Sequence, residues 1–244
     1  MRVFITGDTH GGTSKIEDFC RAMQTTKEDI LVILGDVCIN YDGWYDDHRK
    51  KERLENCPVT LFMIHGNHEM RPDTIPTYKM KEWCGGKVWY EEEYPSLLFA
   101  KDGEFFDLGG KKAFVVGGAY SVDKKQRYFQ WLCGERSSWE WWPDEQPSLE
   151  IKTYCEQQLA EHNWQTDIVL THTCPQKYLP KEAFLVIDDG EEIDSSTEEW
   201  LDWIEEKLTY ETWYCGHFHI DKDIDKMKFL FDDFAELPFS VEKE

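Results

Sequence analysis

Five short polar motifs in this sequence could bind metal ions, because they bring together carboxylate, imidazole and amide side chains. Such oxygen and nitrogen donors suit Mn, Fe, Zn or Ni. A carboxylate among them could bridge two cations about 3.5–4 Å apart, as in two-metal hydrolases. The sequence therefore indicates a metal site if the motifs meet in space. The motifs are Asp8-x-His10, Gly35-Asp36, Gly66-Asn67-His68-Glu69, Thr171-His172 and Gly216-His217-x-His219.

Each motif follows an apolar segment that is typical of a buried strand. In open α/β sheets the carboxyl ends of the strands share one edge, and ligands bind there. The glycines that precede the motifs would let the backbone turn sharply at each strand end. On an extended segment, His217 and His219 would point to the same side. The segments are 3–5, 30–34, 59–64, 168–170 and 213–215.

Helical patterns separate the first strands. Ser14 and Glu17 are spaced as a capping box before apolar residues at helical intervals, and 45–56 is a charged helical stretch. Strand–helix–strand alternation of this kind indicates βαβ units. Further on, Asp102-Gly103 and Gly109-Gly110 are hairpin signals, so we expect an antiparallel meander there. Its strands would be 88–90, 97–100, 105–108 and 113–116.

The second half continues with a helix at 149–162 and a loop in which Asp188-Asp189-Gly190 looks like a turn. Ser195 and Glu198 form another capping-box pattern, and 227–233 is hairpin-like. We expect residues 1–244 to form a single domain.

A Trp-rich segment at about 120–148 fits neither pattern, and we interpret it as an insertion or lid. Trp139, Trp141 and Trp142 could stack a nucleobase, or they could pack the insertion onto the sheet. Packing is the favoured interpretation, because aromatic clusters mostly lie in cores.

In this order and spacing the five motifs resemble the calcineurin-like metallophosphoesterase superfamily, from residue 6 to about 220. The resemblance implies an α/β fold, a four-layer α/β/β/α sandwich with a dinuclear metal site at the carboxyl ends of the strands. It also implies two divalent transition-metal ions, with Mn first and Fe, Zn, Ni or Co as alternatives. The implied ligands are Asp8, His10, Asp36 and His219 for the first metal, and Asp36, Asn67, His172 and His217 for the second.

The resemblance further implies in-line attack on phosphorus by a metal-bridging hydroxide. Asp36 would be the bridging, catalytic carboxylate. His68 would protonate the leaving-group oxygen or steady the transition state. Phosphoprotein phosphatases of the superfamily carry an orienting Asp where this chain has Ile39, and a phosphate-clamping Arg that is absent here. Arg71 or Arg127 could supply a clamp from elsewhere, and a surface salt bridge is an equally good interpretation of each.

Charge narrows the substrate classes. The formal net charge of −22 opposes binding to nucleic acid and to anionic membranes. Two metal ions would reverse the field locally, so a small phosphorylated substrate remains compatible. We therefore expect a dinuclear metal-dependent hydrolase of small phosphomonoesters or phosphodiesters, including nucleotides. The alternatives are a serine/threonine-type phosphoprotein phosphatase and a non-catalytic binding scaffold of the same fold.

The remaining sequence features point to a cytoplasmic protein. The first apolar run is three residues long, so we expect no signal peptide. No apolar stretch approaches the roughly 20 residues of a membrane span. The cysteines form no Cys-x-x-Cys pair, which favours reduced thiols.

Several other histidines and cysteines could be mistaken for ligands. His48 lies in a charged run and is expected on a solvated face, whereas His65 ends a strand and is expected to pack. His162 lies near the end of a helix, where a cation is favourable. Cys174 and Cys215 are expected to be small buried residues rather than soft metal ligands.

Overall fold

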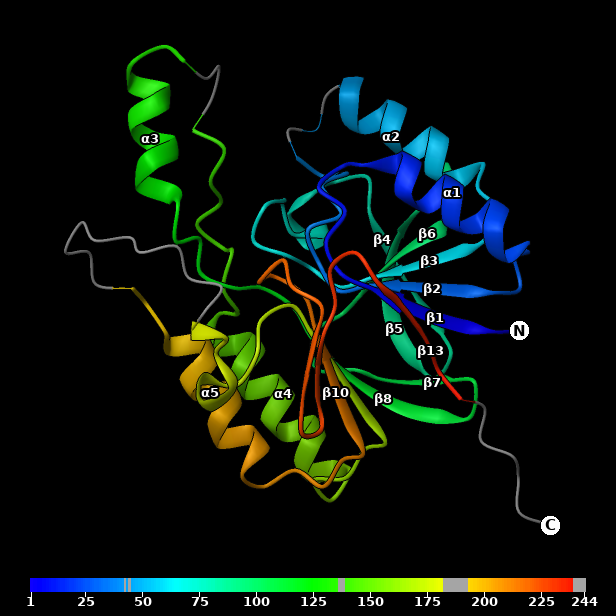
Figure 1. The fold of residues 1–244 in the computed structure, drawn as a ribbon, viewed down its shortest axis with the longest axis vertical. Coiled ribbons are helices and arrows are strands. Elements are labelled where there is room, and N and C mark those ends of the chain that lie inside the picture. Colours follow the sequence, from blue (N-terminus) through cyan, green and yellow to red (C-terminus); the bar gives the residue numbers. More distant parts are fainter. Residues whose placement is uncertain (42, 44, 136–138, 182–192, 239–244) are drawn as a thin grey trace.

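Two β-sheets lie face to face, and helices cover the outer face of each in the computed structural model (Figure 1). The structure describes residues 1–41, 43, 45–135, 139–181 and 193–238. The turn expected at Asp188-Asp189-Gly190 lies outside these residues. Helices α1 and α2 lie on one side of the molecule, and α4 and α5 on the other. The chain therefore has the α/β, four-layer α/β/β/α sandwich that its motifs imply.

The elements have the following bounds in chain order: β1 Val3–Thr6, α1 Thr13–Met23, β2 Ile30–Ile33, α2 Tyr45–Glu55, β3 Thr60–Met63, η1 Pro72–Thr74, β4 Lys79–Trp83, β5 Gly86–Glu91, β6 Tyr94–Ala100, β7 Phe105–Leu108, β8 Lys111–Val116, α3 Lys124–Leu132, α4 Leu149–Glu161, β9 Ile168–Thr171, η2 Gln176–Tyr178, α5 Ser196–Glu205, β10 Thr212–Cys215, β11 Lys222–Ile224, β12 Met227–Phe229 and β13 Phe234–Glu236.

The layers follow from the alternation of side chains along the strands. In β1, Val3 and Ile5 enter the core between the two sheets. Phe4 points the other way, into the core under α1 and α2, where its ring lies 5.1 Å from that of Phe19. A third core packs the second sheet against α4 and α5 around the fully buried Trp213. Both faces of each sheet are therefore buried, as parallel strands require.

The sheet order places the motif-bearing strands side by side. One sheet has the order β13-β1-β2-β3-β6-β5-β4, and the other β11-β12-β10-β9-β8-β7. β1, β2 and β3 pair in parallel in the first sheet, and β9 and β10 pair in parallel in the second. Their carboxyl ends therefore meet at one edge of the sandwich.

The expected antiparallel meander is interrupted in its middle. β5 pairs antiparallel with β6, and β7 with β8, as expected. However, β6 and β7 lie in different sheets, where β6 pairs in parallel with β3 and β8 in parallel with β9. Asp102-Gly103 instead carries the chain from one sheet to the other. The four apolar residues at the end of each of β6 and β8 are all buried, which is the pattern of a strand covered on both faces. The polar edge strand β4 was not expected at all.

The two capping boxes are also absent. Ser14 lies inside α1, whose N-cap is Gly12. Ser195 does occupy the N-cap of α5, but its hydroxyl bonds Glu199 instead of a backbone N–H. Glu198 is used elsewhere, as the buried acceptor of the Thr173 hydroxyl. The final hairpin is β11–β12 rather than 227–233, because β13 crosses to the other sheet.

The Trp-rich segment contains α3, which projects beside the sandwich (Figure 1). Trp139 donates to the carbonyl of Lys124 and packs on Tyr128 and Trp141, with ring centroids 5.0 and 4.6 Å away. These contacts hold the segment together. Its role as an insertion or lid stays a prediction. Among the described residues, no helix is both long enough and apolar enough to cross a bilayer.

The core between the sheets is expected to dominate stability. Phe106 is 1% exposed, and its ring lies 4.7 Å from that of Phe62 across the sheet interface. Phe106→Ala should lower the free energy of unfolding by about 3–5 kcal/mol, because it leaves a cavity there. Urea unfolding followed by tryptophan fluorescence measures this. Phe129→Ala, at a ring 60% exposed, should change it by less than about 0.5 kcal/mol; equal losses would contradict the assigned core.

Candidate metal centre

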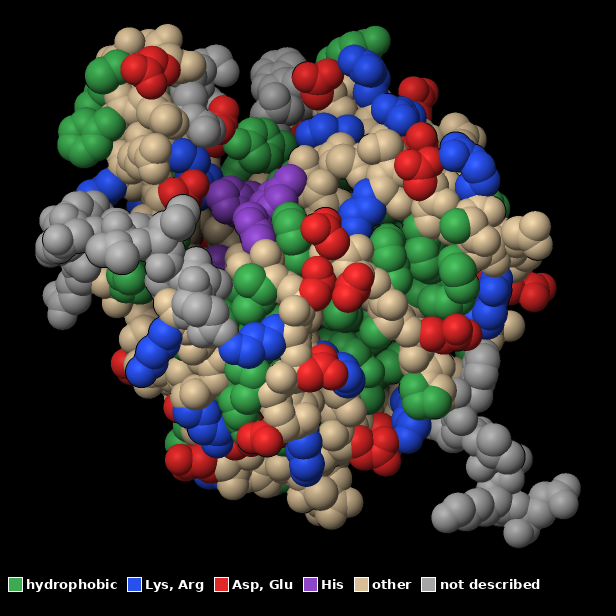
Figure 2. All heavy atoms as spheres, viewed as in Figure 1, with side chains coloured by type: hydrophobic (Ala, Val, Ile, Leu, Met, Phe, Trp, Pro, Cys, Tyr) green, Lys and Arg blue, Asp and Glu red, His purple; other side chains and the backbone are tan. Residues whose placement is uncertain are grey.

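Histidine side chains gather at one place on the face shown in Figure 2, near α3 and the side that carries α1 and α2. The structure brings all seven expected ligand residues to this place. They come from the loops that follow β1, β2, β3, β9 and β10. Two overlapping groups have ligand atoms within 4.8 Å of one another, and they are Asp8 with His10 and His219, and Asp8 with Asp36 and His172.

The first group surrounds a buried carboxylate. Asp8 Oδ2 lies 3.3 Å from His219 Nε2 and 3.8 Å from His10 Nε2. The two histidine nitrogens are themselves 2.8 Å apart. Asp8 is 2% exposed, and its Oδ2 has no hydrogen-bond partner among the described residues. A buried, unsatisfied carboxylate oxygen facing two imidazoles is the environment that a cation would stabilise.

The second group contains two acceptors that face each other. His172 Nδ1 lies 2.7 Å from the carbonyl oxygen of Leu34, so the ring proton belongs on Nδ1 and the lone pair on Nε2. Asn67 Nδ2 lies 2.9 Å from Ser121 Oγ, which turns its Oδ1 toward His172 Nε2 at 2.8 Å. Two lone pairs at that distance repel unless a cation or proton lies between them. The side chains present therefore fit a divalent metal ion.

Asp36 lies between the two groups. Its Oδ1 is 3.6 Å from His172 Nε2, and its Oδ2 is 4.0 Å from His10 Nδ1. His217 joins the second group through its ring, whose centroid is 4.9 Å from that of His172. His68 lies beside Asp36: its backbone N–H donates to Asp36 Oδ1 at 2.9 Å, and its Nε2 is 3.8 Å from Oδ2.

Two glycines make this convergence possible. A Cβ at Gly66 would lie 2.0 Å from Asp36 Oδ1, and one at Gly35 would lie 2.1 Å from His172 Nδ1. Gly35 also has φ +103°, which other residues rarely adopt. The glycines before the motifs are therefore needed for close approach as well as for turning.

Four of the seven residues have left-handed backbones. The φ values are 45° for His10, 47° for Asp36, 66° for His217 and 51° for His219. Such conformations are costly for these residue types, and strain of this kind concentrates at functional sites. The extended geometry expected for the last motif is therefore wrong: His217 turns toward His172, while His219 turns toward Asp8.

Burial and mutual charge set the protonation of the site. Burial alone would raise the pKa of Asp8, but the adjacent His219 ring and the charges of His172 and His10 hold it well below the usual value. Burial, reinforced by the charge of His172, lowers the pKa of His217 to about 3. Burial also lowers the pKa of His68. These shifts favour an ionised Asp8 and a neutral His217, which are the forms that bind metals.

Glu69 binds the backbone beside Asp36, a role that the sequence did not predict. It is fully buried, and its Oε1 accepts the backbone N–H of Val37, directly after Asp36. Burial and the charge of Asp36 raise the pKa of Glu69 well above its usual value. Its place in the Gly-Asn-His-Glu motif was the available signal. Ser121, which orients the Asn67 amide, carried no signal of its own.

A pocket of about 330 Å³ opens beside His10 and His68. Arg127 lines it, whereas Arg71 does not: Arg71 is buried against Asp102, with 2.6 Å between Nη1 and Oδ2. A surface salt bridge is therefore the wrong interpretation of Arg71. The described residues that line the pocket are His10, Cys38, Tyr41, Lys50, His68, Asp123 and Arg127.

The tryptophans do not line this pocket. Trp139 and Trp141 pack within the α3 segment, and Trp142 packs on Tyr41, which lines the pocket, with 5.0 Å between ring centroids. This arrangement supports packing over nucleobase stacking.

The other expectations on single residues hold. His48 is exposed and His65 is 3% exposed, with no ring hydrogen bond among the described residues. His162 is the C-cap of α4. Cys174 and Cys215 are fully buried.

A layered α/β sandwich with clustered Asp, Asn and His side chains at its strand ends defines a metal-binding hydrolase architecture. A family model described as calcineurin-like phosphoesterase matches residues 1–221, and the chain belongs to that family. Family membership implies divalent metal ions and metal-dependent phosphoester hydrolysis. A crystal structure of TT1561 of Thermus thermophilus is similar at 12% identity and a TM-score of 0.46, covering 88% of this chain and 80% of that one. No curated protein matches.

Close packing at Gly66 predicts a selective loss of metal binding. In Gly66→Ala the new methyl group must displace Asp36, so we expect metal affinity to fall at least tenfold, measured by titration calorimetry with Mn²⁺. Gly85→Ala is the matched control, since φ at Gly85 is +85° but nothing lies within 4 Å of its Cβ. The control should lose about 1 kcal/mol of stability through backbone strain and keep its metal affinity. Unchanged affinity in Gly66→Ala would refute the assigned packing.

The depressed pKa of His217 predicts an acid-sensitive apoprotein. The unfolded histidine titrates near 6.5 and the folded one near 3, so the unfolded state binds more protons between these values and stability falls as pH drops. From pH 6.5 to pH 5, His217 should contribute a loss of about 2 kcal/mol in metal-free protein. Chemical unfolding at several pH values measures this. His217→Asn should flatten the slope, while His48→Asn, at an exposed site, should leave it unchanged.

Proposed function

We propose that this protein is a metal-dependent hydrolase of small phosphomonoesters or phosphodiesters, with nucleotides among the candidates. The observation that carries the proposal is the pocket of about 330 Å³ directly beside the clustered ligand residues. Its volume falls in the range of small-molecule sites and gives a phosphorylated compound access to His10 and His68.

The proposed metal-binding residues are those that the strand ends bring together. Bound divalent ions would supply Lewis acidity, lower the pKa of water and offset charge on the phosphoryl oxygens. The oxygen and imidazole donors suit Mn first, and Fe, Zn, Ni or Co as alternatives. We assign Asp8, His10, Asp36 and His219 to one ion, and Asp36, Asn67, His172 and His217 to the other, with Asp36 shared.

The chain's own contribution to the reaction rests on Asp36 and His68. Asp36 lies between the two groups and fixes the backbone of His68 through one carboxylate oxygen. The His68 ring lines the pocket while its Nε2 stays 3.8 Å from the other oxygen. From there its ring could donate to the leaving-group oxygen as the phosphorus–oxygen bond breaks.

The competing functions have less support. A phosphoprotein phosphatase would need an orienting Asp at position 39, but Ile39 is fully buried in the core under α1 and α2. A scaffold that had lost catalysis would not need all seven ligand positions filled. The net charge of −22 opposes nucleic acid and anionic membranes as partners. All eight cysteines are free thiols, which supports a reducing cytoplasmic location.

Two substitutions should separate metal binding from proton transfer. Asp36→Asn should abolish both metal retention and hydrolysis of p-nitrophenyl phosphate, because it removes the shared carboxylate. His68→Gln should retain the metals but lower kcat about 10²–10⁴-fold, as expected for a lost proton donor. Metal content is measured by mass spectrometry and turnover by nitrophenol release, for the monoester and the bis-ester, with added Mn²⁺.

Asp18→Asn serves as the matched control, because its side chain is 69% exposed on α1. It should keep both metal content and turnover. Full activity in Asp36→Asn would refute the shared-ligand assignment. No turnover of either ester by metal-loaded wild type, across a panel that includes nucleotides, would favour the scaffold.

A further inference from the structure

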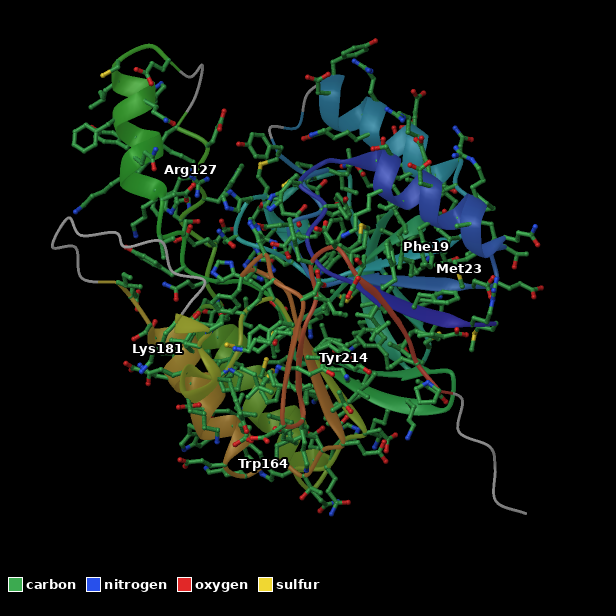
Figure 3. The ribbon with its side chains drawn as sticks, viewed as in Figure 1. Phe19, Met23, Arg127, Trp164, Lys181 and Tyr214 are labelled. Carbon is green, nitrogen blue, oxygen red and sulfur yellow. The ribbon has the colours of Figure 1, made fainter. Side chains whose placement is uncertain are left out.

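Two cationic side chains from separate elements line the pocket beside the metal-binding residues. Lys50 comes from α2, and Arg127 comes from α3 in the Trp-rich segment. Figure 3 shows Arg127 on the side of α3 that faces the rest of the molecule. In a protein of net charge −22, the lining of this pocket holds these two cations against one carboxylate, Asp123.

Arg127 is held in place yet keeps an unused donor. Its side chain is 3% exposed, with Nη2 donating to Asp123 at 2.5 Å and Nη1 donating to the carbonyl of Glu140. Its Nε has no hydrogen-bond partner among the described residues. A buried guanidinium N–H without an acceptor is costly. A ligand oxygen in the pocket would remove that cost.

Lys50 is positioned on the His10 side of the pocket. Its Nζ donates to the carbonyl of Cys38 at 3.0 Å, and Asp47 is 3.9 Å away. A Cβ at Gly11 would lie 3.1 Å from Nζ, so the ammonium packs against the backbone next to His10. An ammonium has three N–H donors, and the Cys38 carbonyl takes only one of them.

The number of cations exceeds what one phosphoryl group needs. The proposed metal ions would already offset the charge of the group under attack. Arg127 lines the same pocket as His68, the residue placed on the leaving-group side. A second phosphate on that side would accept from Arg127 and face Lys50 across the pocket.

We propose that the substrate is a phosphoanhydride, such as a nucleoside diphosphate, whose leaving group is itself a phosphate bound by Arg127 and Lys50. This inference rests on the proposed function and narrows its substrate class. Water's oxygen forms the new bond to the terminal phosphorus, and the bond from that phosphorus to the bridging oxygen breaks. The electron pair stays with the leaving phosphate, and water's proton is released. ADP and water thus give AMP and inorganic phosphate.

The experiment compares ADP with AMP, which differ in whether phosphate or adenosine leaves. Wild type with Mn²⁺ should show a kcat/KM at least tenfold higher for ADP. Lys50→Met and Arg127→Met should each lower kcat/KM at least tenfold more for ADP than for AMP. α,β-Methylene-ADP should inhibit p-nitrophenyl phosphate hydrolysis more strongly than AMP does, and that advantage should shrink in both variants.

Arg49→Met is the matched control, because Arg49 precedes Lys50 on α2 and is 57% exposed. It should leave both substrates unaffected. Arg127 also anchors α3, so Arg127→Met is checked by thermal unfolding, and Lys50→Met carries the test if that variant is misfolded. Equal losses on both substrates, or a wild type that prefers AMP, would overturn the second-phosphate site. A wild type that hydrolyses p-nitrophenyl phosphate but neither nucleotide would overturn the second-phosphate site and leave the proposed function intact. Inactivity on every phosphoester and anhydride would refute the proposed function itself.

Discussion

The structure depends on one electrostatic constraint: two carboxylates, Asp8 and Asp36, lie almost fully buried at the same place. Buried like charges are unfavourable unless cations or hydrogen bonds offset them. Here part of the compensation comes from backbone N–H groups, with His217 donating to Asp8 and His68 donating to Asp36. The remaining compensation of the carboxylate charge must come from the neighbouring imidazoles and from a cation bound among them. The clustered acceptors therefore fit a cation site.

The packing of the two sheets brings the histidines of one sheet to the buried carboxylates of the other. Asp8 and Asp36 follow strands of one sheet, while His172 and His217 follow strands of the other. The site therefore lies at the interface between the two sheets, and its geometry depends on how the sheets are placed relative to each other. Facing side chains such as Phe62 and Phe106 hold that interface together, so core packing and ligand geometry are coupled.

Most of the site could be predicted from sequence, because its information is local. A strand that ends in a polar motif places its side chains at the sheet edge whichever sheet it joins. The pairing of strands that are distant in the sequence was harder to predict. Nothing in the runs 97–100 and 113–116 indicates that one belongs to each sheet, since a buried apolar strand pairs equally well in either. The first capping box failed because α1 already begins after Gly12, before Ser14. The second failed because Glu198 bonds Thr173, a tertiary contact that the local pattern does not contain.

The pocket residues were the hardest to foresee, because their signal is neither periodic nor local. Lys50 lies in a helix so rich in charge that the sequence does not single it out. Its place depends on tertiary contacts, with the carbonyl of Cys38 and the backbone at Gly11. Arg127 depends on a segment outside the strand–motif pattern altogether. The two parts of the site thus differ in origin: the strand ends of the sheets position the candidate metal ligands, whereas α2 and α3 contribute Lys50 and Arg127 to the pocket beside them. Specificity can then change through these two helices without disturbing the buried carboxylates on which the fold depends.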